Sequence, residues 1–277
     1  MRIESTIAAV HSNKLLKATN NSLSKSTDRL SSGKSINRAA DNAAGLAISE
    51  KLKAQMTSLN RAAANAYDGI SMIKTAEGAL NNTHAALQDM RELALQASNA
   101  TLSEVDRNAL QAQANQLSKD IDSISENTEF NTQKLLDGSL ADGFKLQIDP
   151  NAVAGGNASS GTEVNLQSFS AEALGVADLD LTTAEGAAAA IEAIDNAIDT
   201  VTSQRVDLGS VQNRIEYSVN NLSIASENLM AANSQIADVD MAEEFSELTR
   251  QSILQEANLA MQAQANRQSS QILNLLR

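Results

Sequence analysis

Cysteine is absent from this chain of 277 residues, which excludes disulfide frameworks, thiol catalysis and cysteine-ligated metals. Proline occurs once, at Pro150, so both halves of the chain lack the strongest helix breaker. Tryptophan is also absent, and aromatic residues make up only 2% of the sequence. Because aromatic side chains usually dominate a deep core, their scarcity favours thin seams between helices over a thick globular interior.

Basic residues are outnumbered by acidic ones, and the net charge is −13 with a pI near 4.6. A nucleic-acid-binding protein needs a basic stripe for the phosphates, so we expect no nucleic-acid partner. No apolar run approaches the roughly 18 residues that suggest a membrane-spanning helix, and the segment after Met1 is amphipathic. We therefore expect no membrane insertion and no cleaved signal peptide.

Histidine occurs twice, at His11 and His84, and neither has a histidine or cysteine partner at helical spacing. A zinc site would need three or four ligands. Adjacent acids such as Glu243 and Glu244 fit the first turn of a helix better than a catalytic carboxylate pair. The sequence therefore predicts no metal, no cofactor and no enzymatic activity.

Aliphatic residues recur every seven positions in both halves of the chain. A seven-residue apolar repeat is typical of coiled coils, and the repeat in the back half predicts a helix of roughly 65 Å. We therefore predict a mainly α, rod-like, antiparallel coiled-coil helix bundle formed by the N- and C-terminal halves. The two stripes are Leu52, Leu59, Ala66, Ile73, Leu80, Leu87 and Ala94, and Ile194, Val201, Leu208, Ile215, Leu222, Leu229 and Ile236.

The middle of the chain loses this periodicity, and glycine accumulates there. Short alternating runs at 144–148 and 163–166 predict strands. About 50 residues without cysteine or metal make a marginal core, so we expect a small β-hairpin region that lies against the helices. Ser103 to Asp106 resembles a helix start, because a capping residue is followed by acids.

These patterns divide the chain into three parts. Residues 1–42 and 236–277 form a terminal helical pair. Residues 43–127 and 184–235 form a coiled-coil helical domain, and residues 128–183 form the small β and loop region.

Four ordered segments, which lie in both halves, closely resemble the signature of bacterial flagellins. The resemblance covers about residues 1–140 and 185–277, so it leaves out only a short middle and indicates a short form with a minimal hypervariable region. The segments are Arg29–Ser49, Leu87–Ala94, Asn127–Asn131, and Ala263–Gln268 followed by Leu273–Arg277.

The resemblance implies a structural subunit that polymerises into the extracellular flagellar filament and supports motility. In such subunits the terminal helices line the filament channel, the adjoining halves surround them, and the middle faces outward. The implied partners are further copies in a helical homopolymer, a flagellar export chaperone, and the filament cap and hook-junction proteins. Uncleaved export through the flagellar secretion apparatus is also implied. Two alternatives are a hook–filament junction protein and a cytoplasmic coiled-coil signalling or scaffolding protein.

The terminal helices carry apolar residues on several sides, and one partner helix cannot cover them all. We therefore expect these side chains to contact other subunits. The candidates are Ile3, Ile7, Leu16, Leu23, Leu30, Leu254, Leu259, Leu273 and Leu276.

A further segment resembles the part of flagellins that Toll-like receptor 5 recognises. Flagellins that this receptor detects usually carry a basic residue where this chain has Asp89, and a family acid falls at Gln113. The resemblance therefore predicts weakened activation, and the alternative is that Asp89 simply lies on a solvated helix face. The segment comprises Gln88, Asp89, Arg91, Glu92 and Leu93, with Gln113 on the following helix.

The glycine-rich middle contains hydroxyl side chains at Ser159, Ser160, Thr162 and Ser168. Many flagellins are O-glycosylated in this outward-facing region, which makes the four residues candidate glycosylation sites. Solvated loop hydroxyls are the alternative interpretation.

Overall fold

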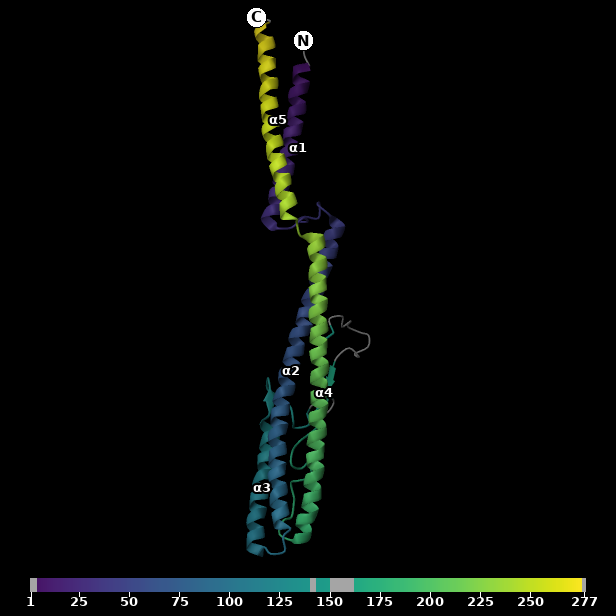
Figure 1. Ribbon diagram of the computed structural model, residues 1–277, viewed down its shortest axis with the longest axis vertical. Coiled ribbons are helices and arrows are strands. Elements are labelled where there is room, and N and C mark those ends of the chain that lie inside the picture. Colours follow the sequence, from purple (N-terminus) through teal and green to yellow (C-terminus); the bar gives the residue numbers. More distant parts are fainter. Residues whose placement is uncertain (1–3, 140–142, 150–161, 276–277) are drawn as a thin grey trace. The chain divides into compact units, whose positions relative to one another are not determined.

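The computed structural model describes residues 4–139, 143–149 and 162–275 (Figure 1). Two compact units can be distinguished, and each is considered by itself. Residues 1–56 and 227–277 make up the terminal unit, and residues 57–226 make up the central unit. The elements are α1 (Glu4–Ser32), α2 (Ala43–Ala97), α3 (Glu104–Asn127), β1 (Glu129–Phe130), β2 (Gln133–Lys134), β3 (Phe144–Leu146), β4 (Thr162–Val164), α4 (Ala184–Ala237) and α5 (Met241–Leu275).

Side-chain caps explain where two of these helices begin. The Ser103 hydroxyl accepts a hydrogen bond from the Asp106 amide at 3.3 Å, and the Asp106 carboxylate accepts one from the Ser103 amide. This reciprocal pair is a capping box, and it confirms the helix start predicted from Ser103. At the start of α5, Asp240 accepts hydrogen bonds from the amides of Ala242 at 2.9 Å and Glu243 at 3.2 Å.

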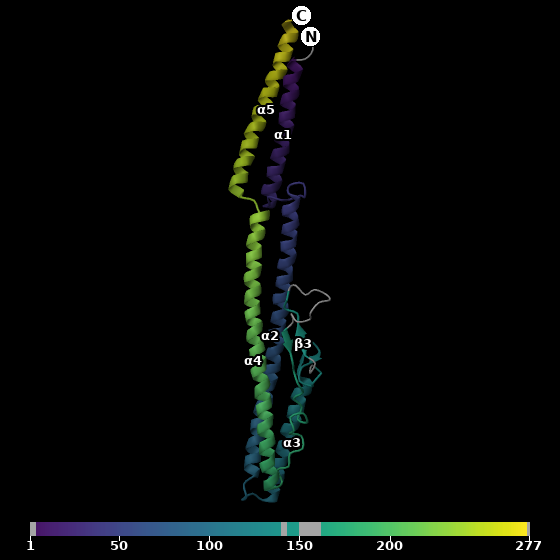
Figure 2. The same cartoon turned by 90° about the vertical axis from the view of Figure 1, so that its right-hand side faces the viewer.

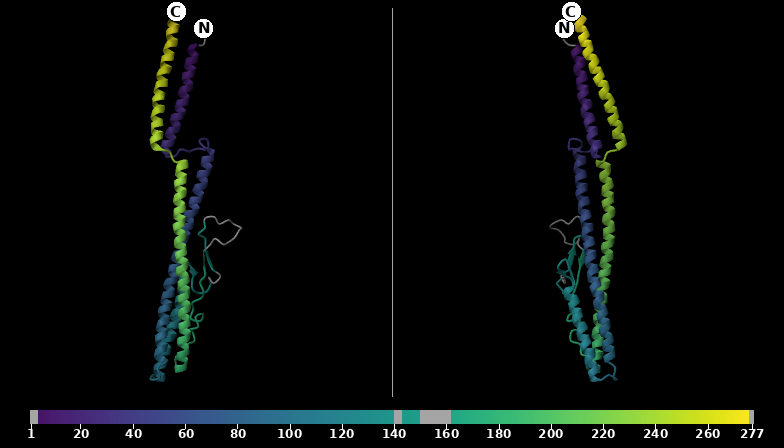
Figure 3. Two further views of the ribbon diagram at one scale, coloured as in Figure 1. Left: turned by 45° about the vertical axis from the view of Figure 1, so that its right-hand side comes forward. Right: turned by 90° about the vertical axis from the view of Figure 1, so that its left-hand side faces the viewer.

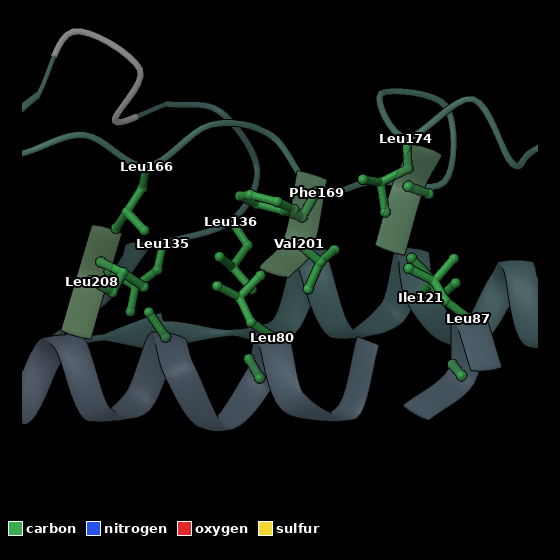
Figure 4. Packing of buried hydrophobic residues seen from close by; sticks show 14 of the residues in the cluster. Leu80, Leu87, Ile121, Leu135, Leu136, Leu166, Phe169, Leu174, Val201 and Leu208 are labelled. Atoms are coloured by element: carbon green, nitrogen blue, oxygen red, sulfur yellow. The ribbon is translucent and has the colours of Figure 1, made fainter. Parts of the chain in front are cut away.

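The central unit has one hydrophobic core, which the seven-residue stripes of α2 and α4 build together with α3. The stripe residues from Leu59 to Ala94 and from Ile194 to Ile215 are buried, as the predicted coiled-coil pattern requires, and Leu222 is half-buried. Figure 4 shows side chains of this cluster from close by. The most deeply buried members include Ile73, Leu80, Leu87, Ile121, Ile194, Val201 and Leu208, each at most 1% exposed.

Two polar contacts fix the relative direction of α2 and α4 inside the central unit. Arg91 Nε donates a hydrogen bond to Asp195 Oδ1 at 2.6 Å. Ser226 Oγ donates to Asn60 Oδ1 at 3.2 Å. Because the partner number falls as the α2 number rises, the helices are antiparallel, and the predicted antiparallel pairing of the two halves is confirmed.

Among the described residues of the β region there are two antiparallel strand pairs, β1–β2 and β3–β4. The strands expected near 144–148 and 163–166 are present, and Phe144 pairs with Val164 across them. β3 lies beside α2 (Figure 2). The Leu146 side chain packs directly over Gly69 of that helix. The predicted small β-hairpin region against the helices is therefore confirmed.

The segment between β4 and α4 is packed more closely than its composition indicates. Leu166, Phe169 and Leu181 are each at most 1% exposed. The amide of Leu181 donates to Gln111 Oε1 at 2.6 Å, so a side chain of α3 holds the backbone of the segment. Irregular chain that lacks periodicity thus completes the core of the central unit.

Among the described residues, no helix is both long enough and apolar enough to cross a membrane.

Candidate subunit interface

In the terminal unit, α1 and α5 pack against each other (Figure 3). The residues buried between them are polar and recur every seven positions. Six residues, named here the polar seam, occupy these positions: Ser12, Thr19 and Ser26 of α1, and Glu244, Gln251 and Asn258 of α5. Five of the six are buried, and Gln251 is half-buried.

Hydrogen bonds cross this seam at several levels. Asn258 Nδ2 donates to Thr19 Oγ1 at 3.1 Å, and Ser12 Oγ donates to the Asn258 carbonyl at 3.4 Å. At the other end of the pair, Arg29 and Glu244 form an ion pair at 3.5 Å. Because buried polar groups are costly unless they are paired, these bonds offset the cost of burying the seam residues between α1 and α5.

Large apolar residues of the same helices lie outside the seam. Val10 of α1 is two residues before Ser12, which places it about 200° around the helix at about 100° per residue. Ile253 of α5 is nine residues after Glu244, so it lies on the opposite side of that helix. The outer apolar set comprises Ile7, Val10, Leu15, Phe245, Ile253, Leu254, Leu259 and Met261, all of which are exposed.

The residues predicted from the sequence as subunit contacts fall into three groups. Ile7, Leu254 and Leu259 are exposed members of the outer apolar set. Leu16, Leu23 and Leu30 are half-buried, and each lies four residues after a seam residue, on the side of α1 that faces α5. Ile3 and Leu276 lie outside the described residues, and Leu273 lies in α5 with its side chain undescribed.

Sequence reasoning did not place Val10, Ile253 and Phe245 among the contact candidates, although all three are more than half exposed. None of them falls on the leucine repeat of α1 or on the leucines selected in α5. The sequence does show the scatter of apolar residues around α5, to which Phe245 and Ile253 belong, because a helix with one buried face keeps its apolar residues on that face. Val10 lies on α1, where its exposure in the structure identifies it.

The connector at residues 33–42 links α1 to α2 and lies against the start of α5. Gly33 ends α1 with φ +69°, a left-handed conformation that favours glycine and is typical of a helix C-cap. Its carbonyl accepts a hydrogen bond from the Val239 amide at 3.1 Å, and the Ser35 amide donates to the Ala237 carbonyl at 2.8 Å. These two bonds tie the connector to the junction of α4 and α5.

A carboxylate organises the other end of the connector. Asp41 pairs with Lys25 of α1 at 2.8 Å and accepts backbone hydrogen bonds from Asn37 and Arg38. The bond from Lys25 is the main cause that lowers the pKa of Asp41 to about 2, and the two amide donors add to it. A charged Asp41 therefore holds the connector against α1 at neutral pH.

On the central unit, α2 and α3 border a hollow of about 430 Å³. Asp89, Glu92 and Leu93 of α2 line it together with Gln113 of α3, so the structure brings these predicted residues together. Gln88 bonds to His84 on its own helix instead. Arg91 bonds to Asp195, which raises the pKa of the guanidinium above its ordinary value.

The candidate glycosylation residues are divided by the structure. Thr162 lies in β4 and is half-buried, and Ser159 and Ser160 lie outside the described residues. Ser168 is half-buried, and its backbone forms an isolated bridge with Asp137.

No group of three metal-binding side chains is present among the residues described. What stands out is a helix pair whose buried residues are polar and whose exposed residues include many large apolar ones, joined to a unit with its own core. Such a pair is typical of a self-assembling helical subunit, because its apolar side chains are covered only by further chains.

The comparisons with known proteins give the family. The bacterial flagellin N-terminal helical region matches residues 3–141, and the flagellin C-terminal helical region matches residues 191–276. Flagellin from Bacillus subtilis (strain 168) is 45% identical over 304 residues, and flagellin from Halalkalibacterium halodurans is 46% identical over 279 residues. Each alignment covers 100% of both chains. The chain belongs to the flagellin family.

A solved structure described as a flagellar hook-associated protein from Vibrio parahaemolyticus is also similar, with a TM-score of 0.61. It covers 72% of this chain and 100% of its own, but at 12% identity it shows the fold alone. The full-length flagellin relatives therefore decide between the alternatives raised by the sequence. The protein is a structural subunit of the extracellular bacterial flagellar filament, and it supports motility.

Proposed function

We propose that the outer apolar set of α1 and α5 is the surface through which copies of the chain join into the filament. The supporting observation is the inverted distribution of polarity, with Asn258 and Glu244 buried while Phe245 and Ile253 are more than 60% exposed. Fully burying one such apolar side chain contributes about 1.5–3 kcal/mol. Covering several of them in each copy therefore favours association strongly.

A pair of substitutions on α5 tests this surface. Leu254→Asp combined with Leu259→Asp places two charges where the outer apolar set would be desolvated, at several kcal/mol each. Filaments should be absent by electron microscopy, while the helical circular dichroism of the central unit remains. The matched control, Leu254→Met with Leu259→Met, keeps the apolar area and should assemble. Filaments of normal length from the aspartate variant would refute the proposal.

We propose that the three parts predicted from the sequence have different roles in the filament. The stripes of α2 and α4 satisfy each other within the central unit, whereas the terminal pair leaves apolar residues uncovered. Residues 1–42 and 236–277 would then form the inner part of the filament, residues 43–127 and 184–235 the layer around it, and residues 128–183 the outer surface.

The same surface motivates the proposed partners other than the chain itself. Before assembly, exposed apolar residues such as Ile253 and Leu259 must be shielded from solvent and from premature association, and an export chaperone would bind them for this purpose. The filament cap and the hook-junction proteins would meet the helices at the two ends of the polymer. A flagellin chaperone should protect α5 from limited proteolysis in the natural chain. Equal protection of the Leu254→Asp, Leu259→Asp variant would contradict this role for the outer apolar set.

Weakened recognition by Toll-like receptor 5 is also proposed. Its support is that Asp89 and Gln113 line one hollow, so that a carboxylate and an amide stand where detected flagellins carry a basic and an acidic group. In a reporter-cell assay, Asp89→Arg should raise potency. Asp207→Arg on α4 makes the same charge change outside the hollow and should leave potency unaltered. Unchanged potency of Asp89→Arg would remove the basis of the proposal.

O-glycosylation in the middle region is the last proposal, and its candidates among the described residues are Thr162 in β4 and Ser168, both of which are half-buried. Native filaments should then give an intact mass above the 29.2 kDa of the bare chain. A mass equal to that of the bare chain would eliminate it.

A further inference from the structure

The polar seam raises the question of what fixes the alignment of α1 on α5. In a coiled coil, interlocking apolar side chains usually set the register. Here the buried positions on α1 hold the hydroxyls of Ser12, Thr19 and Ser26, which recur at an interval of seven residues. The half-buried leucines of α1 recur at the same interval. Sliding the helices by one heptad, about 10.5 Å, therefore presents α5 with an almost unchanged surface.

The amide contacts of the seam do not distinguish these alignments. Asn258 lies between Ser12 and Thr19. Its backbone carbonyl accepts a hydrogen bond from the Ser12 hydroxyl, and its side-chain amide donates one to the Thr19 hydroxyl. After a slip of one heptad it would lie between Thr19 and Ser26, again beside two hydroxyls. Hydroxyl–amide bonds thus allow α1 and α5 to pair without choosing between neighbouring registers.

Arg29 and Glu244 do distinguish them. The carboxylate side chain of Glu244 is only 10% exposed and lies 3.5 Å from the Arg29 guanidinium, whose side chain is 29% exposed. After a slip of one heptad, Glu244 would face either Ser22 or a position beyond Ser32, where α1 ends. Neither Ser22 nor Ile36, seven residues after Arg29, is a cation, so the shifted helix pair would leave the buried Glu244 carboxylate without its direct partner.

The pair also has unused hydrogen-bonding capacity. Arg29 Nε and Glu244 Oε1 are buried and have no hydrogen-bond partner among the described residues. Burying these two charged groups costs desolvation free energy, and the attraction between Arg29 and Glu244 is the main interaction that offsets this cost. Buried ion pairs often contribute less stability than apolar pairs of similar volume, so the stability of the helix pair does not by itself explain why a charged pair occupies this position.

We infer that Arg29 and Glu244 form a register lock, which acts together with the Gly33–Val239 and Ser35–Ala237 backbone bonds of the connector to select one alignment of α1 on α5 out of several that the heptad-spaced hydroxyls would accept. The inference rests on the filament function, since it describes how the terminal helices must be aligned for the outer apolar set to meet the next copy. It assigns to Glu244 the role of a positioning residue.

The absence of cysteine makes the register directly measurable. Gln255 Nε2 donates to Asn20 Oδ1 at 2.9 Å across the two helices. Asn20→Cys with Gln255→Cys therefore reports the observed register. Thr27→Cys or Asn13→Cys, each with Gln255→Cys, reports a slip of one heptad in either direction. A thiol crosslinker shorter than about 10.5 Å separates the three cases, and the monomer band on a denaturing gel shows that the link is within one chain.

In filaments of the full chain, the 20–255 pair should crosslink and the two shifted pairs should not. Adding Glu244→Gln removes the charge and keeps the shape, so the ratio of shifted to observed crosslinks should rise about tenfold or more. Exchanging the charges, with Arg29→Glu and Glu244→Arg together, should restore the 20–255 crosslink alone. If Glu244→Gln prevents assembly, the exchanged pair should still assemble.

Two results would overturn the lock. One is an unchanged crosslinking pattern in Glu244→Gln filaments, and the other is failure of the charge-exchanged chain to assemble in the observed register. Assembly of the unmodified chain is measured first. Absence of filaments at that stage would speak against the filament function itself, and not against the lock.

Discussion

Replacing Gly69 by alanine should destabilise the central unit, although the same change elsewhere in α2 should stabilise it. A Cβ atom at Gly69 would lie 2.6 Å and 2.9 Å from the two methyl groups of Leu146, which is buried in β3. At Gly78, also in α2, nothing lies within 4 Å of such an atom. The two glycines therefore share a helix and differ in what covers them.

The magnitudes follow from two opposed effects. Alanine improves helix propensity by about 1 kcal/mol over glycine. Overpacking against Leu146 costs about 1–3 kcal/mol. Gly78→Ala should therefore raise the free energy of unfolding by about 0.5–1 kcal/mol. Gly69→Ala should lower it by up to about 2 kcal/mol, which is the larger cost minus the helical gain.

A double-mutant cycle isolates the contact. In a Leu146→Ala background the obstruction is gone, so Gly69→Ala should become stabilising by about 1 kcal/mol. Urea unfolding followed by tyrosine fluorescence is suited to this test, because the only two tyrosines, Tyr67 and Tyr217, both lie in the central unit. If Gly69→Ala stabilises as much as Gly78→Ala while Leu146 is present, the proposed docking of β3 on α2 is wrong.

Two further predictions concern the connector and the core. The carboxyl of Asp41 should titrate near pH 2 by NMR, and Lys25→Ala should move its pKa upward. Because the pKa is lower in the folded state than in the unfolded state, the contribution of charged Asp41 to folding stability is complete above about pH 4. This contribution is lost as the pH falls toward 2. A midpoint near 4 in the natural chain would contradict the Lys25 contact. Leu87→Ala should lower the free energy of unfolding by about 2–5 kcal/mol, since Leu87 is fully buried. Leu95→Ala on the same helix, 60% exposed, should change it by less than about 0.5 kcal/mol, and equal losses would argue against the predicted seam.

The seams of the central unit were predictable because their physical signal is strong and local. Ile73, Leu80 and Leu87 repeat every seven residues, and this interval on a helix leaves few alternatives to a buried stripe. The segment after β4 could not be predicted in the same way. Phe169 and Leu181 are buried by contacts with distant helices, and irregular chain has no period that would reveal them.

The interface was predictable only in part. The sequence indicated correctly that α5 has apolar residues on several sides, because Phe245, Ile253 and Leu254 do not fall on one face. It did not reveal the polar seam. Ser12, Thr19 and Ser26 are also seven apart, yet hydroxyl residues are ordinarily interpreted as solvent-facing. Their burial depends on partners such as Asn258, more than 200 residues away in the chain.

The central claim is that the terminal helices drive polymerisation, while the remainder of the chain folds and buries its own apolar residues without contacts to other copies. The most direct measurement compares the full chain with a fragment of residues 43–235 by sedimentation and electron microscopy. The full chain should form long filaments, and the fragment should remain monomeric and helical at the same concentration. Filaments formed by the fragment would contradict the claim.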